Sequence, residues 1–288
     1  MRHPALTVLF ASLLLNWSHA SHLVAGDAVF SRDGKRIYVI AQVPLKPEGK
    51  SYSERDYKPA VEEIDCEAKT IRTILTTEYL RGIACTHENK IFCTTESALH
   101  SFDPITGTLT KIRDAAAGTG FWRVAYDPKS KALFVTTDGK TDPLFMLKQS
   151  DEWVPVRMRR HPYPSCLVFA ANGDLFFAAY GDLWHGEIQN DEGYFSLAAY
   201  RYAPLATLET ANTTPAEIGV SDIGVAGDAI YVQLARMGGS GDGWLAQLAR
   251  PRRKRLAGSA CRRTKLAFIM FFVGSIGSSP TVGPKNCG

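Results

Sequence analysis

The sequence lacks the short motifs that mark the common enzyme classes. Its 288 residues contain no nucleophile elbow, no Walker loop, no paired zinc ligands and no EF-hand loop. The glycine-rich residues 238–243 precede no helical pattern and lack the Lys-Ser or Lys-Thr pair of a phosphate-binding loop. We also find no amphipathic helix. These absences argue against nucleotide-dependent chemistry and against a helical fold.

Cysteine is scarce. The six cysteines are too scattered for a disulfide scaffold, and no two have the C-x-x-C spacing of a zinc or redox motif. Cys85 and Cys93 flank a short polar turn, which would let them face each other across a hairpin. Two alternatives stay open: a disulfide, or two small apolar side chains in neighbouring strands.

Acidic residues are missing from one end of the chain. From residue 250 onward there are nine Lys or Arg and no Asp or Glu, so residues 1–249 carry 24 bases against 29 acids. The net charge of this larger part is −5, and the overall +4 comes from the tail. A mildly acidic body does not favour nucleic acid as a partner.

Residues 1–20 have the pattern of a secretory signal peptide. Arg2 precedes an apolar run over residues 5–15, and Ser18-His19-Ala20 provides a small-residue cleavage site. That run is shorter than the roughly 20 residues that a membrane span requires. We therefore expect no membrane span, and a mature protein that is secreted or periplasmic.

One structural phrase repeats along the chain at intervals of about 40 to 55 residues. An apolar strand and a polar turn are followed by a second strand that ends in aromatic and β-branched residues. Third and fourth strands follow, as in residues 98–102 and 108–112 around the turn Asp103-Pro104-Ile105-Thr106-Gly107. The copies begin at Ala28, Ile83, Val124, Leu167 and Ile223. Four strands per repeat predict an all-β fold, a β-propeller of four-stranded blades with about five blades visible and an incomplete ring.

The repeat resembles the bacterial YVTN and WD40-like β-propeller superfamily. Ile37-Tyr38-Val39-Ile40 and Leu133-Phe134-Val135-Thr136 are similar to its signature strand, and residues 102–109 are similar to its strand-turn-strand element. The resemblance extends over about residues 25–249 and implies blade architecture without implying a ligand. Residues 21–249 are thus the predicted propeller.

Residues 250–288 differ from this pattern. They hold a basic cluster and a continuous apolar run over residues 266–273, without the alternation of a blade strand. We expect this tail to lie outside the packed propeller. It is either a genuine basic tail or sequence from a shifted reading frame.

Function is predicted only at the level of class. We expect a binding or scaffolding module for an unknown protein or small-molecule ligand, with no evident cofactor. The alternative is a calcium-dependent, gluconolactonase-like hydrolase, for which Asp138, Asp142 and Asp182 are weak calcium-ligand candidates. Turn capping by Asp is the simpler explanation of the same aspartates. Core or inter-blade packing is the interpretation of the large aromatic residues Trp122, Trp153, Tyr180 and Trp184.

Export generates the first testable prediction. If residues 1–20 are a signal peptide, the mature protein begins at Ser21. N-terminal sequencing of exported protein should return Ser21 as the first residue. Recovery of an intact Met1 terminus from the soluble cytoplasm would contradict the prediction.

Overall fold

The computed structural model describes residues 28–31, 33–44, 57–77, 79–139, 143–158, 164–191, 194–203, 218–226, 229–236, 243–249 and 269–273. Within these residues the regular elements are all β-strands, and no helix has the length and apolar character needed to cross a membrane. The predicted signal peptide and Asp142 lie outside the described residues.

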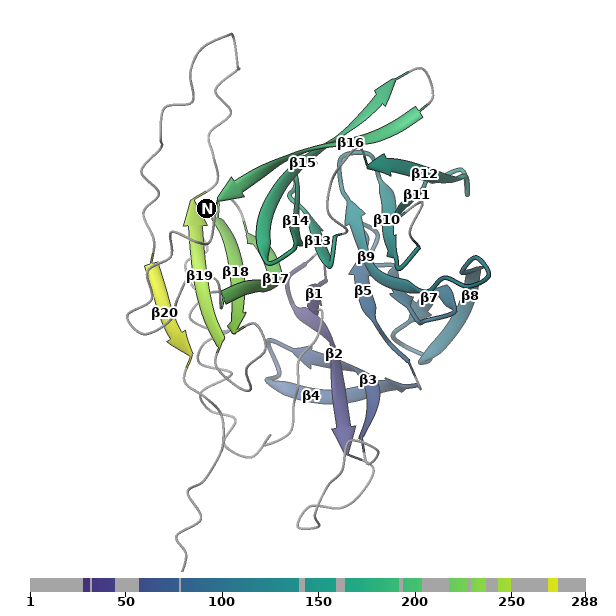
Figure 1. Ribbon diagram of the computed structural model, residues 1–288. Coiled ribbons are helices and arrows are strands. Elements are labelled where there is room, and N and C mark those ends of the chain that lie inside the picture. Colours follow the sequence, from purple (N-terminus) through teal and green to yellow (C-terminus); the bar gives the residue numbers. More distant parts are fainter. Residues whose placement is uncertain are drawn as a thin grey trace, which may run out of the picture.

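The described residues form twenty strands, arranged in five four-stranded blades (Figure 1). Blade 1 contains β1 (Ala28–Phe30), β2 (Arg36–Pro44), β3 (Tyr57–Asp65) and β4 (Thr70–Thr76). Blade 2 contains β5 (Gly82–Cys85), β6 (Ile91–Thr94), β7 (Ala98–Asp103) and β8 (Thr108–Asp114). Blade 3 contains β9 (Phe121–Asp127), β10 (Ala132–Thr137), β11 (Leu144–Leu147) and β12 (Trp153–Met158). Blade 4 contains β13 (Cys166–Phe169), β14 (Leu175–Ala179), β15 (Asp182–Asp191) and β16 (Tyr194–Ala203). Blade 5 contains β17 (Ile218–Ala226), β18 (Ala229–Arg236), β19 (Gly243–Ala249) and β20 (Ile269–Val273).

Within each blade, consecutive strands pair antiparallel, and the first strands of successive blades pack side by side from β1 through β5, β9 and β13 to β17. This is the radial arrangement of a β-propeller. The predicted all-β fold and the four-stranded blade are confirmed.

Among the residues that the structure describes, the core consists of four apolar clusters, and each cluster lies between two successive blades. Phe134 of blade 3, for example, packs against Phe169 of blade 4 with ring centroids 4.7 Å apart. Burying one such side chain stabilises the fold by roughly 1.5–3 kcal/mol. Among the described residues, no corresponding cluster joins blade 5 to blade 1.

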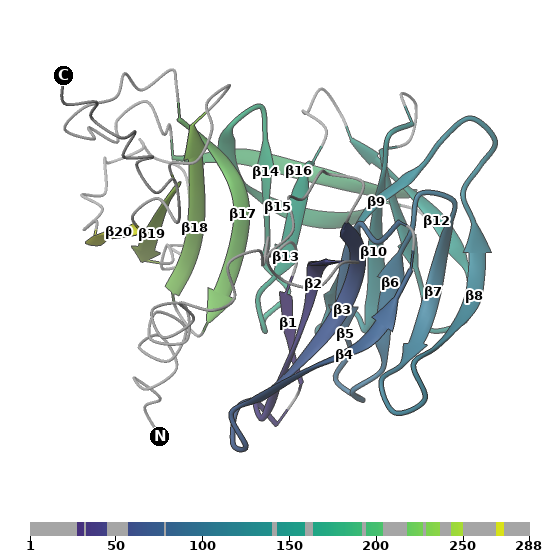
Figure 2. The ribbon, with the colours of Figure 1, turned by 90° about the horizontal axis from the view of Figure 1, so that it is seen from below.

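The long β15–β16 hairpin ties blade 4 to blade 3. Its outer strand, β16, pairs in parallel with β12, with Val156 opposite Phe195 and Met158 opposite Leu197. Figure 2 shows the hairpin running across to β12. The two blades therefore form one eight-stranded sheet, and the edge of β12 is not left open to other chains.

The structure differs from the expectation for the apolar run of the tail. Ile269–Val273 forms β20 and pairs antiparallel with β19, with Trp244 opposite Phe272 and Gln247 opposite Ile269. A short continuous apolar run is compatible with a strand even without alternation, which is why the pattern was misleading. The other residues of 250–288 lie outside the described part of the chain, so the tail boundary stays a prediction.

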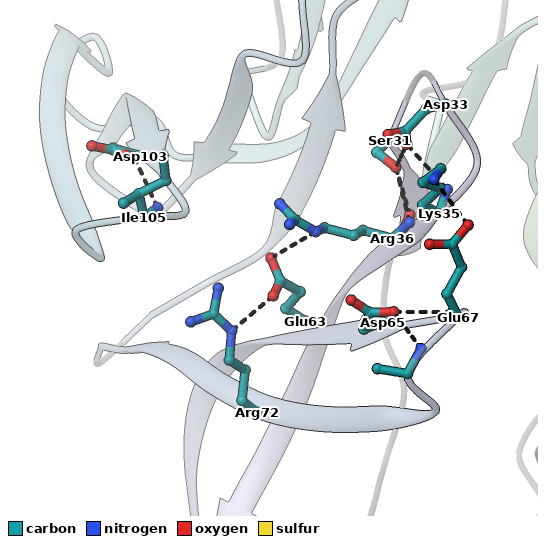
Figure 3. Close-up of polar contacts among 11 residues, drawn as sticks. Ser31, Asp33, Lys35, Arg36, Glu63, Asp65, Glu67, Arg72, Asp103 and Ile105 are labelled. Atoms are coloured by element: carbon teal, nitrogen blue, oxygen red, sulfur yellow. Dashed lines mark hydrogen bonds and ion pairs between the residues drawn. The ribbon is translucent and has the colours of Figure 1, made fainter.

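Turn chemistry is as the sequence predicts at residues 103–107. The Asp103 carboxylate accepts a hydrogen bond from the Ile105 amide at 2.9 Å (Figure 3). It also accepts one from the Thr106 hydroxyl at 2.8 Å. The Ile105 amide holds the pKa of Asp103 below its usual value, and Thr106 adds to the effect. Gly107 has φ +71°, and a Cβ there would lie 2.7 Å from the carbonyl oxygen of Ile74.

Blade 1 contains a buried carboxylate between two arginines (Figure 3). Glu63 on β3 accepts a 2.7 Å hydrogen bond from Nε of Arg72 on β4, and Nε of Arg36 on β2 lies 3.9 Å from its other oxygen. Only 6% of the Glu63 side chain is exposed. A buried carboxylate is tolerated because its charge is paired.

Replacing Glu63 tests this arrangement. Glu63→Gln keeps the shape but removes the charge, so the free energy of unfolding should fall by about 2 kcal/mol, as expected for a charge-assisted hydrogen bond. The matched control is Glu67→Gln, because Glu67 pairs with Lys35 at 2.9 Å in an exposed position. Urea unfolding should show a clear loss for the first variant and none for the control; equal effects would contradict the assignment.

Candidate functional site

One end of the blades gathers aromatic and charged side chains. The first strand of each blade begins at this end, and the turn between the second and third strands returns to it. Backbone hydrogen bonds between blades show the alignment: the Phe121 amide donates to the Glu96 carbonyl at 3.0 Å, and the Val220 amide donates to the Gly181 carbonyl at 3.1 Å. We call Arg81, Glu96, Trp122, Arg123 and Asp222 the mouth cluster.

Arg81 and Trp122 form the exposed part of the mouth cluster. Arg81 immediately precedes β5, and its guanidinium carbon lies 4.6 Å from the ring centroid of Trp122 on β9. Its Nη2 atom is 3.4 Å from Oε1 of Glu96. The Thr94 hydroxyl donates to the Trp122 carbonyl at 2.8 Å and so fixes the backbone beneath the ring. Trp122 nevertheless leaves 46% of its surface in solvent.

Arg123 forms the inner part of the mouth cluster. Its Nη1 atom donates to the Arg81 carbonyl at 2.9 Å, and its backbone amide donates to the Thr136 hydroxyl at 2.9 Å. The close approach depends on Gly82, because a Cβ there would lie 2.9 Å from the Cα of Arg123. Arg123 is thus held between blades 2 and 3.

Asp222 brings a carboxyl group from blade 5. Burial raises the pKa of Asp222, whereas the Ile223 amide, which donates to it at 2.9 Å, and the charge of Arg123 lower it. Asp222 lies two residues after Val220 on β17, and the Val220 amide bonds to the Gly181 carbonyl at the mouth end, so Asp222 lies near that end. The cluster therefore offers an aromatic face, two guanidinium donors and two carboxylate acceptors, which suits recognition of a polar ligand.

The predicted calcium set of Asp138, Asp142 and Asp182 stays a prediction, because Asp142 lies outside the described residues. The Asp138 carboxylate accepts a hydrogen bond from the Gly120 amide, and the Asp138 amide donates to the Gly120 carbonyl at 3.1 Å. Asp138 therefore joins the end of β10 to the start of β9. Asp182 begins β15 and pairs with Ala179. In the part of the chain that the structure describes, no three His, Cys, Asp or Glu side chains gather closely enough to hold a metal ion. The described donors do not fit a calcium site.

The predicted facing of Cys85 and Cys93 is wrong in register. Cys93 pairs with Ile83, and Cys85 pairs with Ile91, two positions away. Both are free thiols that pack with the cluster between blades 1 and 2. Burial raises the pKa of Cys93 to about 12 and that of Cys85 to about 11. The structure corresponds to the second alternative, two small apolar side chains.

The aromatic residues divide into two groups. Trp153 and Trp184 pack as predicted, against Phe145 and Phe177. Trp122 and Tyr180 do not, because they are 46% and 78% exposed. The sequence signal for Trp122 was its place at the start of a first strand, next to an arginine, where a propeller blade exposes its loops.

The pKa of Asp222 leads to a prediction of pH dependence. Its pKa in the folded state is raised above the ordinary value of 3.8, so the folded protein binds its proton more tightly than the unfolded chain does. The folded protein therefore loses stability as pH rises from 3.8 to the raised pKa. Asp222→Asn should remove this loss. The difference in unfolding free energy between the variant and the natural protein should therefore be more favourable to the variant at pH 7 than at pH 4.

Asp103→Asn is a control of opposite sign. The pKa of Asp103 is lowered, so its contribution is present above 3.8 and disappears as pH falls. Thermal unfolding of both variants across pH 3–7 checks the signs. The same pH response in both variants would contradict the assignment.

Comparison with known proteins shows the fold and no family. No family model matches the chain, and no curated protein matches it. A putative gluconolactonase aligns at 11% identity over 79% of this chain and 86% of its own, with a TM-score of 0.51. Regucalcin from Agrobacterium tumefaciens, described as a calcium-binding protein, aligns at 12% identity over 79% of this chain and 71% of its own, with a TM-score of 0.53. Both are β-propellers, and this chain shares that fold.

Proposed function

We propose that this protein is an exported, YVTN-like β-propeller that acts as a binding scaffold, with its ligand docking on the mouth cluster. The observation that carries the proposal is the exposed Trp122 ring stacked under Arg81 at the end of the blades. An aromatic ring that stays in water does not contribute the free energy that its burial would give. Trp and Arg are also the residue types enriched in binding hot spots.

The surroundings support recognition rather than mere tolerance of an exposed ring. Arg81 is held by Glu96 at 3.4 Å, and the Trp122 carbonyl is held by Thr94 at 2.8 Å. Because both partners are fixed before a ligand arrives, less side-chain freedom is lost on binding. A rigid frame with a few directed polar groups is the usual construction of a ligand site.

The alternative function is a calcium-dependent lactonase. It is supported by the fold shared with a putative gluconolactonase and with regucalcin, at identities of 11% and 12% that speak for the fold alone. No arrangement of the described carboxylates favours the lactonase over a binding protein, because the Asp138 carboxylate accepts a hydrogen bond from the Gly120 amide. Binding at the mouth cluster is therefore our conclusion.

Two variants test the proposal. Trp122→Ala removes the ring, and Arg81→Ala removes the guanidinium that covers it. Ile105→Ala is the control, because Ile105 is 85% exposed in a turn at the opposite end of blade 2. The probes are organic acids such as citrate, neutral hexasaccharides and oligopeptides, screened by thermal shift and measured by calorimetry.

We expect at least one probe class to bind the natural protein and the Ile105 control equally. Its affinity should fall about tenfold in the Trp122 and Arg81 variants, which corresponds to about 1.4 kcal/mol. Binding that both variants retain, or a protein that binds none of the probes, would contradict the proposal.

A further inference from the structure

In the described part of the chain, three exposed aromatic rings lie at the mouth end, one from each of three successive blades. Tyr79 precedes β5 and is 60% exposed, Trp122 lies on β9 and is 46% exposed, and Tyr180 lies between β14 and β15 and is 78% exposed. Gly173, in the turn between β13 and β14, lies close to Lys129, in the turn between β9 and β10, so these two turns share one end of blades 3 and 4. Trp122 at the start of β9 and Tyr180 at the end of β14 therefore share the other end, which is the mouth end. The rings are therefore distributed around one rim.

Tyr180 occupies a backbone position that does not suit it. Its φ is +50°, and that of Gly181 is +79°, so both central residues of this two-residue hairpin turn are left-handed. Such a turn favours Asn-Gly, and a bulky side chain at positive φ is uncommon. Tyr180 gains little from packing because it is mostly exposed. A strained backbone that presents a large ring to solvent indicates a functional role for the ring.

We propose that the mouth binds an extended saccharide, whose sugar rings stack on Tyr79, Trp122 and Tyr180. This inference rests on the proposed binding function and names its ligand class. A pyranose presents apolar C–H faces that stack on aromatic rings, and hydroxyl groups around its edge that need donors and acceptors. Arg81 and Glu96 supply both beside Trp122.

The arrangement of charge favours a saccharide over a protein partner. The core of a protein interface is a contiguous apolar patch from which charged residues are depleted. Here the three rings come from different blades, and the Trp122 ring is covered on one face by the guanidinium of Arg81, 4.6 Å from its centroid. An aromatic ring flanked by hydrogen-bonding groups, as at Trp122, matches the apolar face and the surrounding hydroxyls of a sugar.

Tyr180→Asn provides the decisive variant, because Asn tolerates positive φ and carries no ring. We expect its melting temperature to equal or exceed that of the natural protein, while its affinity falls at least fivefold. Tyr180→Phe should keep the affinity, and Ile105→Ala at the opposite end is the control. The probes are neutral β-1,4-linked hexasaccharides of glucose and of N-acetylglucosamine, with a proline-rich peptide of similar length, all measured by calorimetry on the full chain.

Binding of a hexasaccharide that weakens in Tyr180→Asn and Trp122→Ala supports the inference. Hexasaccharide binding that is unchanged in both variants overturns it, as does the absence of any hexasaccharide binding at millimolar concentration. If the peptide alone binds and loses affinity in Trp122→Ala, the saccharide inference fails while the proposed binding function stands.

Discussion

Packing between the faces of neighbouring blades is the constraint on which the rest of the structure depends. Strand β14 shows it most directly, because all five of its residues are buried. Phe176 and Ala178 belong to the cluster shared with blade 5, whereas Leu175, Phe177 and Ala179 belong to the cluster shared with blade 3. Since side chains alternate between the two faces of a strand, a strand between two blades is apolar at every position. Face packing also sets where each first strand begins, and hence the geometry of the mouth.

The sequence predicts those features that depend on neighbouring residues. The turn at Asp103 follows from its own side chain and from Gly107, and the four-stranded repeat follows from local alternation and turn residues. Register is harder, because a shift of two residues preserves the same alternation. Cys85 and Cys93 illustrate this, since they lie on the predicted hairpin but not opposite each other. The pairing of β20 with β19 was also not predicted, because a five-residue apolar run has no periodicity that would identify it as a strand.

The candidate site could not be predicted because its contacts join different blades. Arg81 and Trp122 are separated by about one repeat in sequence, and they meet only because Gly82 lets β5 approach β9 closely. Asp222 comes from blade 5 and is influenced by Arg123 of blade 3. Neither pairing follows from spacing along the chain. Each requires knowing how far one blade is rotated from the next, and side-chain packing across the blade faces determines that rotation.

Backbone hydrogen bonds hold the mouth in place independently of the side chains displayed there. Amide and carbonyl groups join blade 3 to blade 2 at Phe121 and Glu96, and blade 5 to blade 4 at Val220 and Gly181. At the other end, the His87 ring accepts or donates a hydrogen bond with the Tyr126 hydroxyl of the next blade and stacks on its ring. Because main-chain bonds fix the rim, its side chains can change without loss of the fold, which is consistent with the shared architecture of proteins only 11% and 12% identical to this one. Tyr180 has positive φ in a turn that Asn would form with less strain, so the fold alone does not require its ring.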